Sequence, residues 1–209
     1  MDGIAAAIGR YREVRLSLHR RRSGAGVIAT ALLSLAMACF TGLMAQVVIP
    51  LPWTPVPITG QTLAVLLAAM ALGRRGALSQ LLYLAIGFAG VPWFAGAAGG
   101  QAVMAGPTVG YLAGFVVAAY LAGAILDRYR GARTFFPLVI IMCAANVVII
   151  LGMGTLYLYF WLVAVKGAAP GPAALLYMGA IPFLPGAAVK TLLAAFIGTA
   201  ILPKEPVRF

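Results

Sequence analysis

The chain has 209 residues, of which 63% are hydrophobic and only 9% are charged. A soluble domain of this length could not cover its surface with so few polar groups, so the composition indicates an integral membrane protein. A formal net charge of +11 is compatible with a nucleic-acid partner. The basic residues, however, form short clusters between long apolar runs, which argues against a nucleic-acid surface.

Sequence signatures of enzymatic chemistry are absent from the chain. It contains no GK pair for a Walker-type phosphate loop, and no HExxH, CxxC or GxSxG motif. His19 is the one histidine and lies in the basic N-terminal segment. Cys39 and Cys143 lie inside apolar runs, where a packing role without a disulfide is expected. We therefore expect no enzymatic activity, no metal site, and no ATP binding by this chain alone.

Six apolar segments follow a basic stretch at residues 1–23, for which we expect a short helix on the membrane surface. A straight membrane helix needs about 20 apolar residues, so the short second segment and the long or Gly- and Pro-interrupted last two are not simple rods. The sequence predicts an all-α polytopic membrane protein, with a six-helix substrate-binding domain at 24–203 and a tail at 204–209. The predicted spans are 26–49, 61–73, 76–95, 107–126, 135–163 and 173–202.

Charge in the connections predicts the topology. The N-terminal segment, the Arg74-Arg75 turn, the loop DRYRGAR and the tail KEPVR hold nearly all the basic residues. These are alternate connections, and the positive-inside rule places them in the cytoplasm with both termini. The remaining connections are PLPWTPVPITGQ, VPWFAGAAGGQAVMAG and KGAAPGP, whose single charge is Lys166. They are predicted to face the opposite side.

The outer connections combine prolines, aromatics, glycines and amides. Prolines around Trp53 stiffen the first connection, which can then cover a site at a small entropic cost; an interfacial anchor is the alternative. In the second connection, Trp93 and Phe94 precede a run of small residues that ends at Gly100 and Gln101. Small residues let the backbone approach a ligand closely, and a tight re-entrant turn is the alternative.

Lys190 is a single cation in the otherwise apolar run PFLPGAAVKTLLAAF. A lysine at the centre of a membrane helix costs about 2.5–3.5 kcal/mol, and less near the interface, where its stem can snorkel to water. All the acids of the chain fall on the predicted cytoplasmic side: Asp2, Glu13, Asp127 and Glu205. Two interpretations stand. Lys190 either snorkels to water or anchors a mostly apolar ligand that carries an anionic or strongly polar group.

Other polar residues in the apolar segments have two interpretations as well. Hydrogen bonding between helices explains each of them at least as well as ligand contact does, and is favoured for Asn146. The group consists of Gln61, Gln80, Tyr83, Asn146 and Tyr177.

The first segment carries a small-residue face at four-residue spacing, formed by Ser34, Ala38 and Gly42. Such a face permits close helix contact in lipid. The spacing alone favours contact within the chain's own bundle, and contact with another membrane subunit is the alternative.

Four motifs together resemble a known family: the PITGQT turn, VPWFAG, GPTVGY and the ending PFLPGAAVK. They are similar to those of the BioY family, the biotin-specific substrate-capture (S) components of energy-coupling-factor (ECF) vitamin transporters. The likeness runs from about residue 45 to 195. It implies six membrane helices, biotin capture from the outer face of a prokaryotic cell membrane, and no cofactor. It also implies a transmembrane coupling protein and two ATPases as partners, and favours the partner interpretation of the Ser34 face.

One position departs from the family pattern, which commonly has an acid directly after Pro-Gly. Here that position is Ala187, three residues before Lys190. The lysine charge is then free to meet the ligand carboxylate or a ureido oxygen. Acceptors for the ureido N–H groups must come from elsewhere, such as Gln101, Gln61 or backbone carbonyls.

The predicted pocket lies near the start of the last helix, lidded by the first outer loop and walled by residues 93–106. An S component for a different small vitamin and a non-transporting membrane assembly subunit are the alternatives. The predicted ligand-binding residues are Lys190, Gln101, Trp53, Gln61, Trp93, Phe94, Gly100 and Tyr83.

Overall fold

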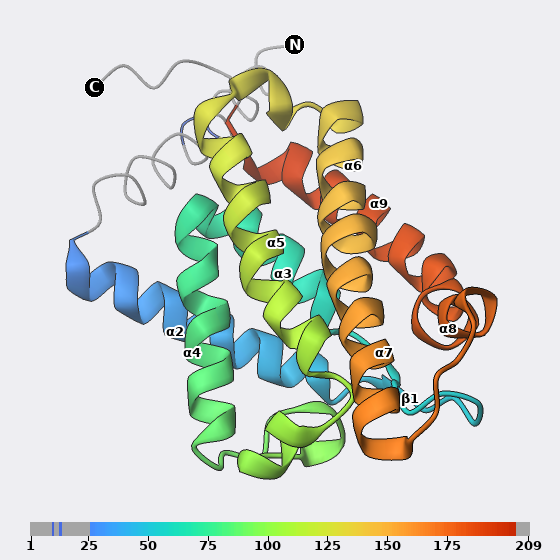
Figure 1. The fold of residues 1–209 in the computed structure, drawn as a ribbon. Coiled ribbons are helices and arrows are strands. Elements are labelled where there is room, and N and C mark those ends of the chain that lie inside the picture. The colour runs from blue at the N-terminus through green and yellow to red at the C-terminus, as the bar shows by residue number, and fades with distance from the viewer. Residues whose placement is uncertain (1–9, 11–12, 14–25, 204–209) are drawn as a thin grey trace.

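The computed structural model describes residues 10, 13 and 26–203, so the predicted N-terminal helix and the tail lie largely outside the described residues. Helices dominate it (Figure 1). In chain order the elements are α2 (Val27–Ala45), β1 (Val48–Ile49), β2 (Ile58–Thr59), α3 (Gln61–Leu72), η1 (Gly73–Arg75), α4 (Gly76–Phe88), η2 (Ala95–Ala97), η3 (Gln101–Ala105), α5 (Val109–Arg128), η4 (Arg130–Arg133), α6 (Phe135–Cys143), η5 (Ala144–Leu151), α7 (Gly152–Lys166), α8 (Pro172–Gly179), η6 (Ile181–Phe183) and α9 (Leu184–Ile201).

Each of the six predicted segments contains a helix. By length and composition, five stretches within 26–203 are candidates to cross a membrane, because α3, η1 and α4 count together as one apolar stretch, Gln61–Phe88. The mostly helical, multi-pass character is therefore confirmed, whereas six separate crossings remain a prediction. The departures from an all-helical chain among these residues are a short antiparallel hairpin, which pairs Val48 with Thr59 and Ile49 with Ile58, and an isolated bridge between Phe94 and Ala98.

Gly and Pro end or interrupt the helices. Helix α4 ends at Phe88, short of the predicted residue 95, because Gly90 adopts a φ of 118° that a right-handed helix cannot contain, and Pro92 follows. Helix α7 ends at Lys166, and the Gly167 that follows adopts the left-handed conformation (φ 63°), as glycines after a helix commonly do. The predicted interruption of the last segment is η6, which contains Pro182. The fifth segment is continuous, but η5 is π-helical.

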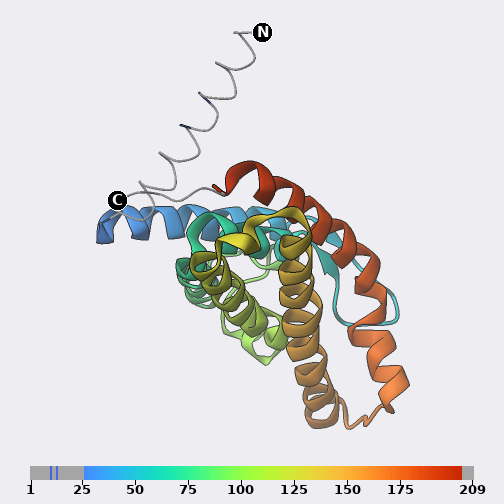
Figure 2. The same cartoon turned by 90° about the horizontal axis from the view of Figure 1, so that it is seen from above.

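Helix α5 is central to the packing and contacts α3, α4 and α7, whereas α2 and α9 cover one side of the molecule (Figure 2). The contact between α5 and the η1 turn requires a glycine, because a Cβ at Gly123 would meet the backbone of Gly73. Likewise, a Cβ at Gly154 of α7 would meet the Tyr111 ring of α5. Small residues thus set how closely these helices approach.

The small-residue face of α2 is buried within the chain. Ser34 and Ala38 are fully buried, and α2 packs against α4. A Cβ at Gly42 would lie 3.1 Å from the Trp93 ring. The partner-surface interpretation of Ser34, Ala38 and Gly42 is therefore corrected, because this face is already covered by α4 and the loop that follows it.

The described arginines of the connections gather at one end of the helices, in and beside η1 and η4 (Figure 1), whereas Lys166 is the last residue of α7. There the backbone N–H of Arg74 donates to Asp127 Oδ2 at 2.9 Å. The buried Arg133 donates to the carbonyls of Leu126 at 2.9 Å and Pro203 at 3.1 Å. The hairpin and the loops that join α4 to α5 and α7 to α8 lie at the other end (Figure 1).

Candidate ligand-binding cavity

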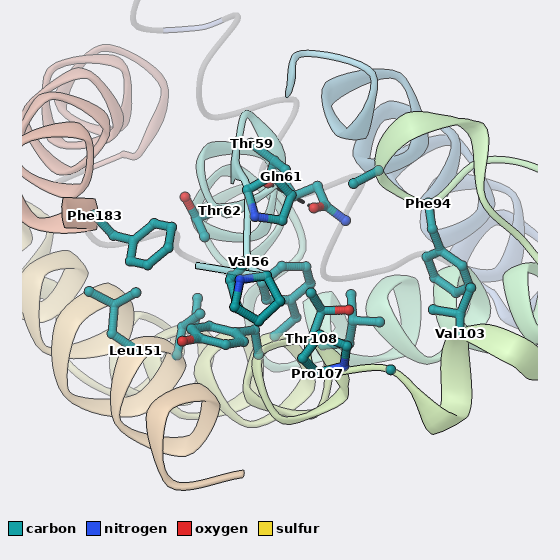
Figure 3. Close-up of a pocket in the computed structure, with 18 of the residues that line it drawn as sticks. Val56, Thr59, Gln61, Thr62, Phe94, Val103, Pro107, Thr108, Leu151 and Phe183 are labelled. Atoms are coloured by element: carbon teal, nitrogen blue, oxygen red, sulfur yellow. Dashed lines mark hydrogen bonds between the residues drawn. The ribbon is translucent and has the colours of Figure 1, made fainter. Parts of the chain in front are cut away.

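A cavity of about 300 Å³ opens between the loops of that second end and the helices beneath them. Its walls come from the hairpin loop, α3, the 94–108 segment, α5, η5 and the start of the last helix. In Figure 3, Phe183 and Leu151 line one side, and Phe94 and Val103 line the other. The lining residues are Pro55, Val56, Pro57, Thr59, Gln61, Thr62, Phe94, Ala95, Ala98, Val103, Gly106, Pro107, Thr108, Tyr111, Leu112, Phe115, Asn146, Ile150, Leu151, Phe183, Ala187 and Lys190.

Lys190 is the one charged side chain among the described residues that line the cavity. Its Nζ donates to the Thr59 carbonyl at 2.6 Å and to Thr62 Oγ1 at 3.0 Å. The ammonium group is therefore held at the start of α3, at the cavity wall, which favours the ligand-anchor interpretation over snorkelling. An ammonium has three N–H donors, so one remains for a ligand. The positive N-terminal end of α3 lies beside it and adds to the attraction for an anion or a carbonyl oxygen.

A hydrogen-bonded chain fixes Gln61 at the cavity wall. Gln61 Oε1 accepts from Thr59 Oγ1 at 2.8 Å, and Gln61 Nε2 donates to Tyr83 Oη at 2.7 Å. Tyr83 Oη in turn donates to the Trp93 carbonyl at 3.3 Å. Both ends of the Gln61 amide are thus engaged, so the side chain is rigid before any ligand arrives.

The loop after α4 places Phe94 in the wall. The Phe94 ring packs edge-on against Tyr83, with ring centroids 5.2 Å apart, and Trp93 donates from Nε1 to the Tyr83 carbonyl at 3.0 Å. Gln46, at the end of α2, holds the same loop through Nε2 bonds to the carbonyls of Trp93 and Phe94 at 3.1 and 3.2 Å. Its Oε1 accepts from the Ala97 N–H at 3.2 Å. Nothing in the sequence marks Gln46, because this role depends on the fold.

The structure separates the eight predicted ligand-binding residues into three groups. Lys190, Gln61 and Phe94 line the cavity. Tyr83 and Trp93 lie one layer behind the wall and position Gln61 and Phe94. The other three are not among the lining residues: Trp53 and Gln101 are exposed, and Gly100 (φ 81°) shapes its loop by donating to the Gly87 carbonyl.

Sequence reasoning missed several polar lining residues. Thr108 and Tyr111 both stand in the GPTVGY motif, and that motif was a signal available for both. Asn146 was expected to make an interhelical contact, and its Nδ2 does donate to the Ala187 carbonyl at 3.4 Å, but it also lines the cavity. Tyr111 Oη donates to the Gly179 carbonyl at 2.7 Å and so ties α5 to α8.

Apolar walls with one cation and a few amide and hydroxyl groups suit a small, largely apolar molecule that carries a polar or anionic group. The fold and the cavity thus define a polytopic membrane protein with a cavity suited to a small molecule at one end of its helices.

Comparisons with known proteins identify the family within this class. The model of the BioY family matches residues 16–206. A probable biotin transporter BioY of Methanothermobacter thermautotrophicus is 47% identical over 141 residues, which are 67% of this chain and 90% of that protein. The biotin transporter BioY of Rhodobacter capsulatus is 36% identical over 177 residues, which are 79% of this chain and 92% of that protein. The chain belongs to the BioY family.

A solved structure agrees with this assignment. The crystal structure of the S-component for biotin from an ECF-type ABC transporter superposes with a TM-score of 0.72 at 26% sequence identity. The match covers 82% of this chain and 89% of that one.

Proposed function

We propose that this protein takes up biotin: it captures the vitamin in the Lys190 cavity as the substrate-specific component of an ECF-type transporter. The observation that carries the proposal is a ligand-sized cavity with a single cation in a chain of the BioY family. The relatives are named as biotin transporters, and the solved neighbour is the S-component for biotin. The protein is a transport component and not an enzyme.

The chemistry of biotin fits the cavity. Its fused rings and aliphatic tail match apolar walls such as Phe94, Leu112 and Phe183. Its carboxylate and its ureido oxygen both accept hydrogen bonds, and the remaining Lys190 donor suits either of them. Only part of the contact energy will appear as affinity, because loop ordering is subtracted.

We further propose the membrane topology of the protein and the partners that supply energy for transport. Six crossings of the cell membrane by a domain at 24–203, with both termini in the cytoplasm, place the cavity at the outer face. The gathering of Arg74, Arg75, Arg128, Arg130 and Arg133 at the opposite end supports this orientation. Transport energy would come from a transmembrane coupling protein and two ATPase subunits.

The test is a biotin titration on the purified protein in detergent. Lys190→Met keeps the length of the side chain but removes the charge. We expect the substitution to raise the Kd roughly 10- to 100-fold, because a hydrogen bond from a charged group is worth about 1.5–3 kcal/mol. Lys166→Met is the matched control, since Lys166 is exposed and lies outside the cavity lining.

Each outcome has a distinct meaning. Tight binding that Lys190→Met weakens and Lys166→Met leaves unchanged supports both the ligand and its anchor. Tight binding in all three proteins would keep the function but remove the anchor role of Lys190. No binding by the folded wild type would contradict biotin as the ligand and favour a different vitamin or an assembly role.

A further inference from the structure

Asn146 is a buried polar residue whose hydrogen-bonding capacity is only partly used. It lines the cavity from the π-helical segment η5 and is 1% exposed. Its Nδ2 donates to the Ala187 carbonyl at 3.4 Å. Its Oδ1 has no hydrogen-bond partner within the described part of the chain. A buried amide oxygen without a partner is costly, so such a group at a cavity wall points to a ligand that supplies the missing donor.

The contact with Ala187 fixes which end of the amide is free. A backbone carbonyl can only accept a hydrogen bond, so the nitrogen of Asn146 must face it and the oxygen must face elsewhere. The free group at this wall is therefore an acceptor, and it requires a ligand with an N–H or O–H donor.

Other polar atoms of the wall can also accept, because the hydroxyls of Thr108 and Tyr111 keep lone pairs, but among the described lining residues only Asn146 has a buried side-chain acceptor with no partner. Gln61 Oε1 already accepts from Thr59. Tyr111 Oη is engaged with the Gly179 carbonyl. Lys190 is a donor only. Asn146 contacts the backbone one helical turn before Lys190, so an acceptor and a cation flank the same side of the cavity.

We propose that Asn146 Oδ1 accepts a hydrogen bond from a ureido N–H of biotin and makes the cavity selective for ligands with a donor at that point. This proposal rests on the proposed biotin function and adds a specificity residue to it. A ureido group fits because its N–H groups are strong donors that lose their bonds to water when they enter an apolar cavity. Asn146 Oδ1 replaces one of those bonds.

The experiment combines a variant with modified ligands. Asn146→Leu keeps the size of the side chain and removes the acceptor. Two biotin analogues, each methylated at one ureido nitrogen, remove one donor at a time, and biotin methyl ester alters only the carboxylate. Thr191→Val is the matched control, because Thr191 also has a buried, unpartnered oxygen but is not among the cavity-lining residues.

We expect Asn146→Leu to weaken biotin binding roughly 10- to 100-fold and Thr191→Val to leave it unchanged. In the wild type, at least one methylated analogue should lose affinity to a similar extent, and that loss should largely disappear in Asn146→Leu. The methyl ester should lose the same factor in both proteins. If the effects of Asn146→Leu and of methylation at one ureido nitrogen are not additive, the two groups form a direct hydrogen bond. An Asn146 with a purely structural role would give additive effects.

Asn146→Ala serves if the leucine variant does not fold. It also removes the acceptor oxygen, so it should weaken biotin binding and lose the methylation penalty in the same way. Undiminished binding by Asn146→Leu, or a methylation penalty that persists in it, would overturn the inference while leaving biotin capture intact. Absence of biotin binding by the wild type would contradict the proposed function itself.

Discussion

Lys190 shows how an apolar helix can carry a charge at the wall of a cavity. Its ammonium group is bonded to the Thr59 carbonyl and Thr62 Oγ1, which come from the hairpin and from α3. These bonds offset part of the cost of burial and fix the donor in place before a ligand binds. A cation held in advance loses little side-chain entropy on binding, which favours affinity.

Tyr83 lies behind the wall and offers a test of how the wall is held. Tyr83→Phe removes the hydroxyl that accepts from Gln61 Nε2 and leaves that buried donor without its partner. We expect the free energy of unfolding to fall by about 1–3 kcal/mol and biotin affinity to fall as well, because Gln61 is then free to turn. Thermal unfolding in detergent, with and without biotin, measures both effects.

Tyr177→Phe is the control for this change, since Tyr177 is 57% exposed and its hydroxyl has water or lipid headgroups as alternative partners. Equal unfolding temperatures for the two variants would show that the Gln61–Tyr83 bond contributes nothing to stability.

At the residue scale, the sequence predicts which kinds of side chain the cavity contains better than it predicts which residues line it. Lys190, Gln61 and Phe94 stand out by type and context, and all three line it. Trp53 and Gln101 share that context but are exposed, because the side that a loop residue faces depends on the whole fold. Charge and motif are local properties of the sequence, whereas exposure is not.

At the scale of elements, the side chain of Gln46 at the end of α2 holds the loop at residues 93–98 by hydrogen bonds, which we call the Gln46 clamp. Ala97 has a φ of 56°, a conformation that costs a residue other than glycine roughly 1–3 kcal/mol, and its N–H is held by Gln46 Oε1. The same Gln46 side chain binds the carbonyls of Trp93 and Phe94. The clamp therefore offsets strain in the loop that carries Phe94 into the cavity wall.

Gln46→Ala tests the clamp. Without it, the loop should open more often, and biotin should dissociate faster, with a Kd raised roughly fivefold for a loss of about 1 kcal/mol. The measurement is the association and dissociation kinetics of biotin. Gln101→Ala is the control, because Gln101 is exposed, and it also tests its predicted role as a ligand contact. A larger effect at Gln101 than at Gln46 would reverse the assignment of the two amides.

The helical segments are predictable because the apolar runs and the Gly and Pro that end them are local features. The interruption at η6 follows from the prolines of that segment. The hairpin and the π-helical η5 are not predictable in the same way, because tertiary contacts decide them. The small-residue face of α2 is also only partly predictable. Its spacing predicts close packing, but only the fold shows that α4 packs against it.

At the scale of the whole molecule, the charge distribution and the cavity define opposite ends. The arginines of η1 and η4 lie at one end, and the loops around the cavity lie at the other (Figure 1). Because the positive-inside rule retains basic residues in the cytoplasm, the proposed orientation opens the cavity to the outside. A protein that captures a scarce vitamin for uptake requires this orientation.

Cysteine labelling tests the orientation directly. In a variant with Cys39 and Cys143 replaced by Ala, a single cysteine is introduced at Ala169 in the loop between α7 and α8, or at Gly131 in η4; both positions are exposed. A membrane-impermeant thiol reagent should label Ala169→Cys in intact cells, and Gly131→Cys only after permeabilisation. The cysteine-free parent controls for background labelling. The reverse pattern would place the cavity in the cytoplasm, and capture from outside would then be impossible whatever the affinity for biotin. Labelling of both positions in intact cells would show that the chain does not keep a single orientation, and the positive-inside argument would fail for this protein.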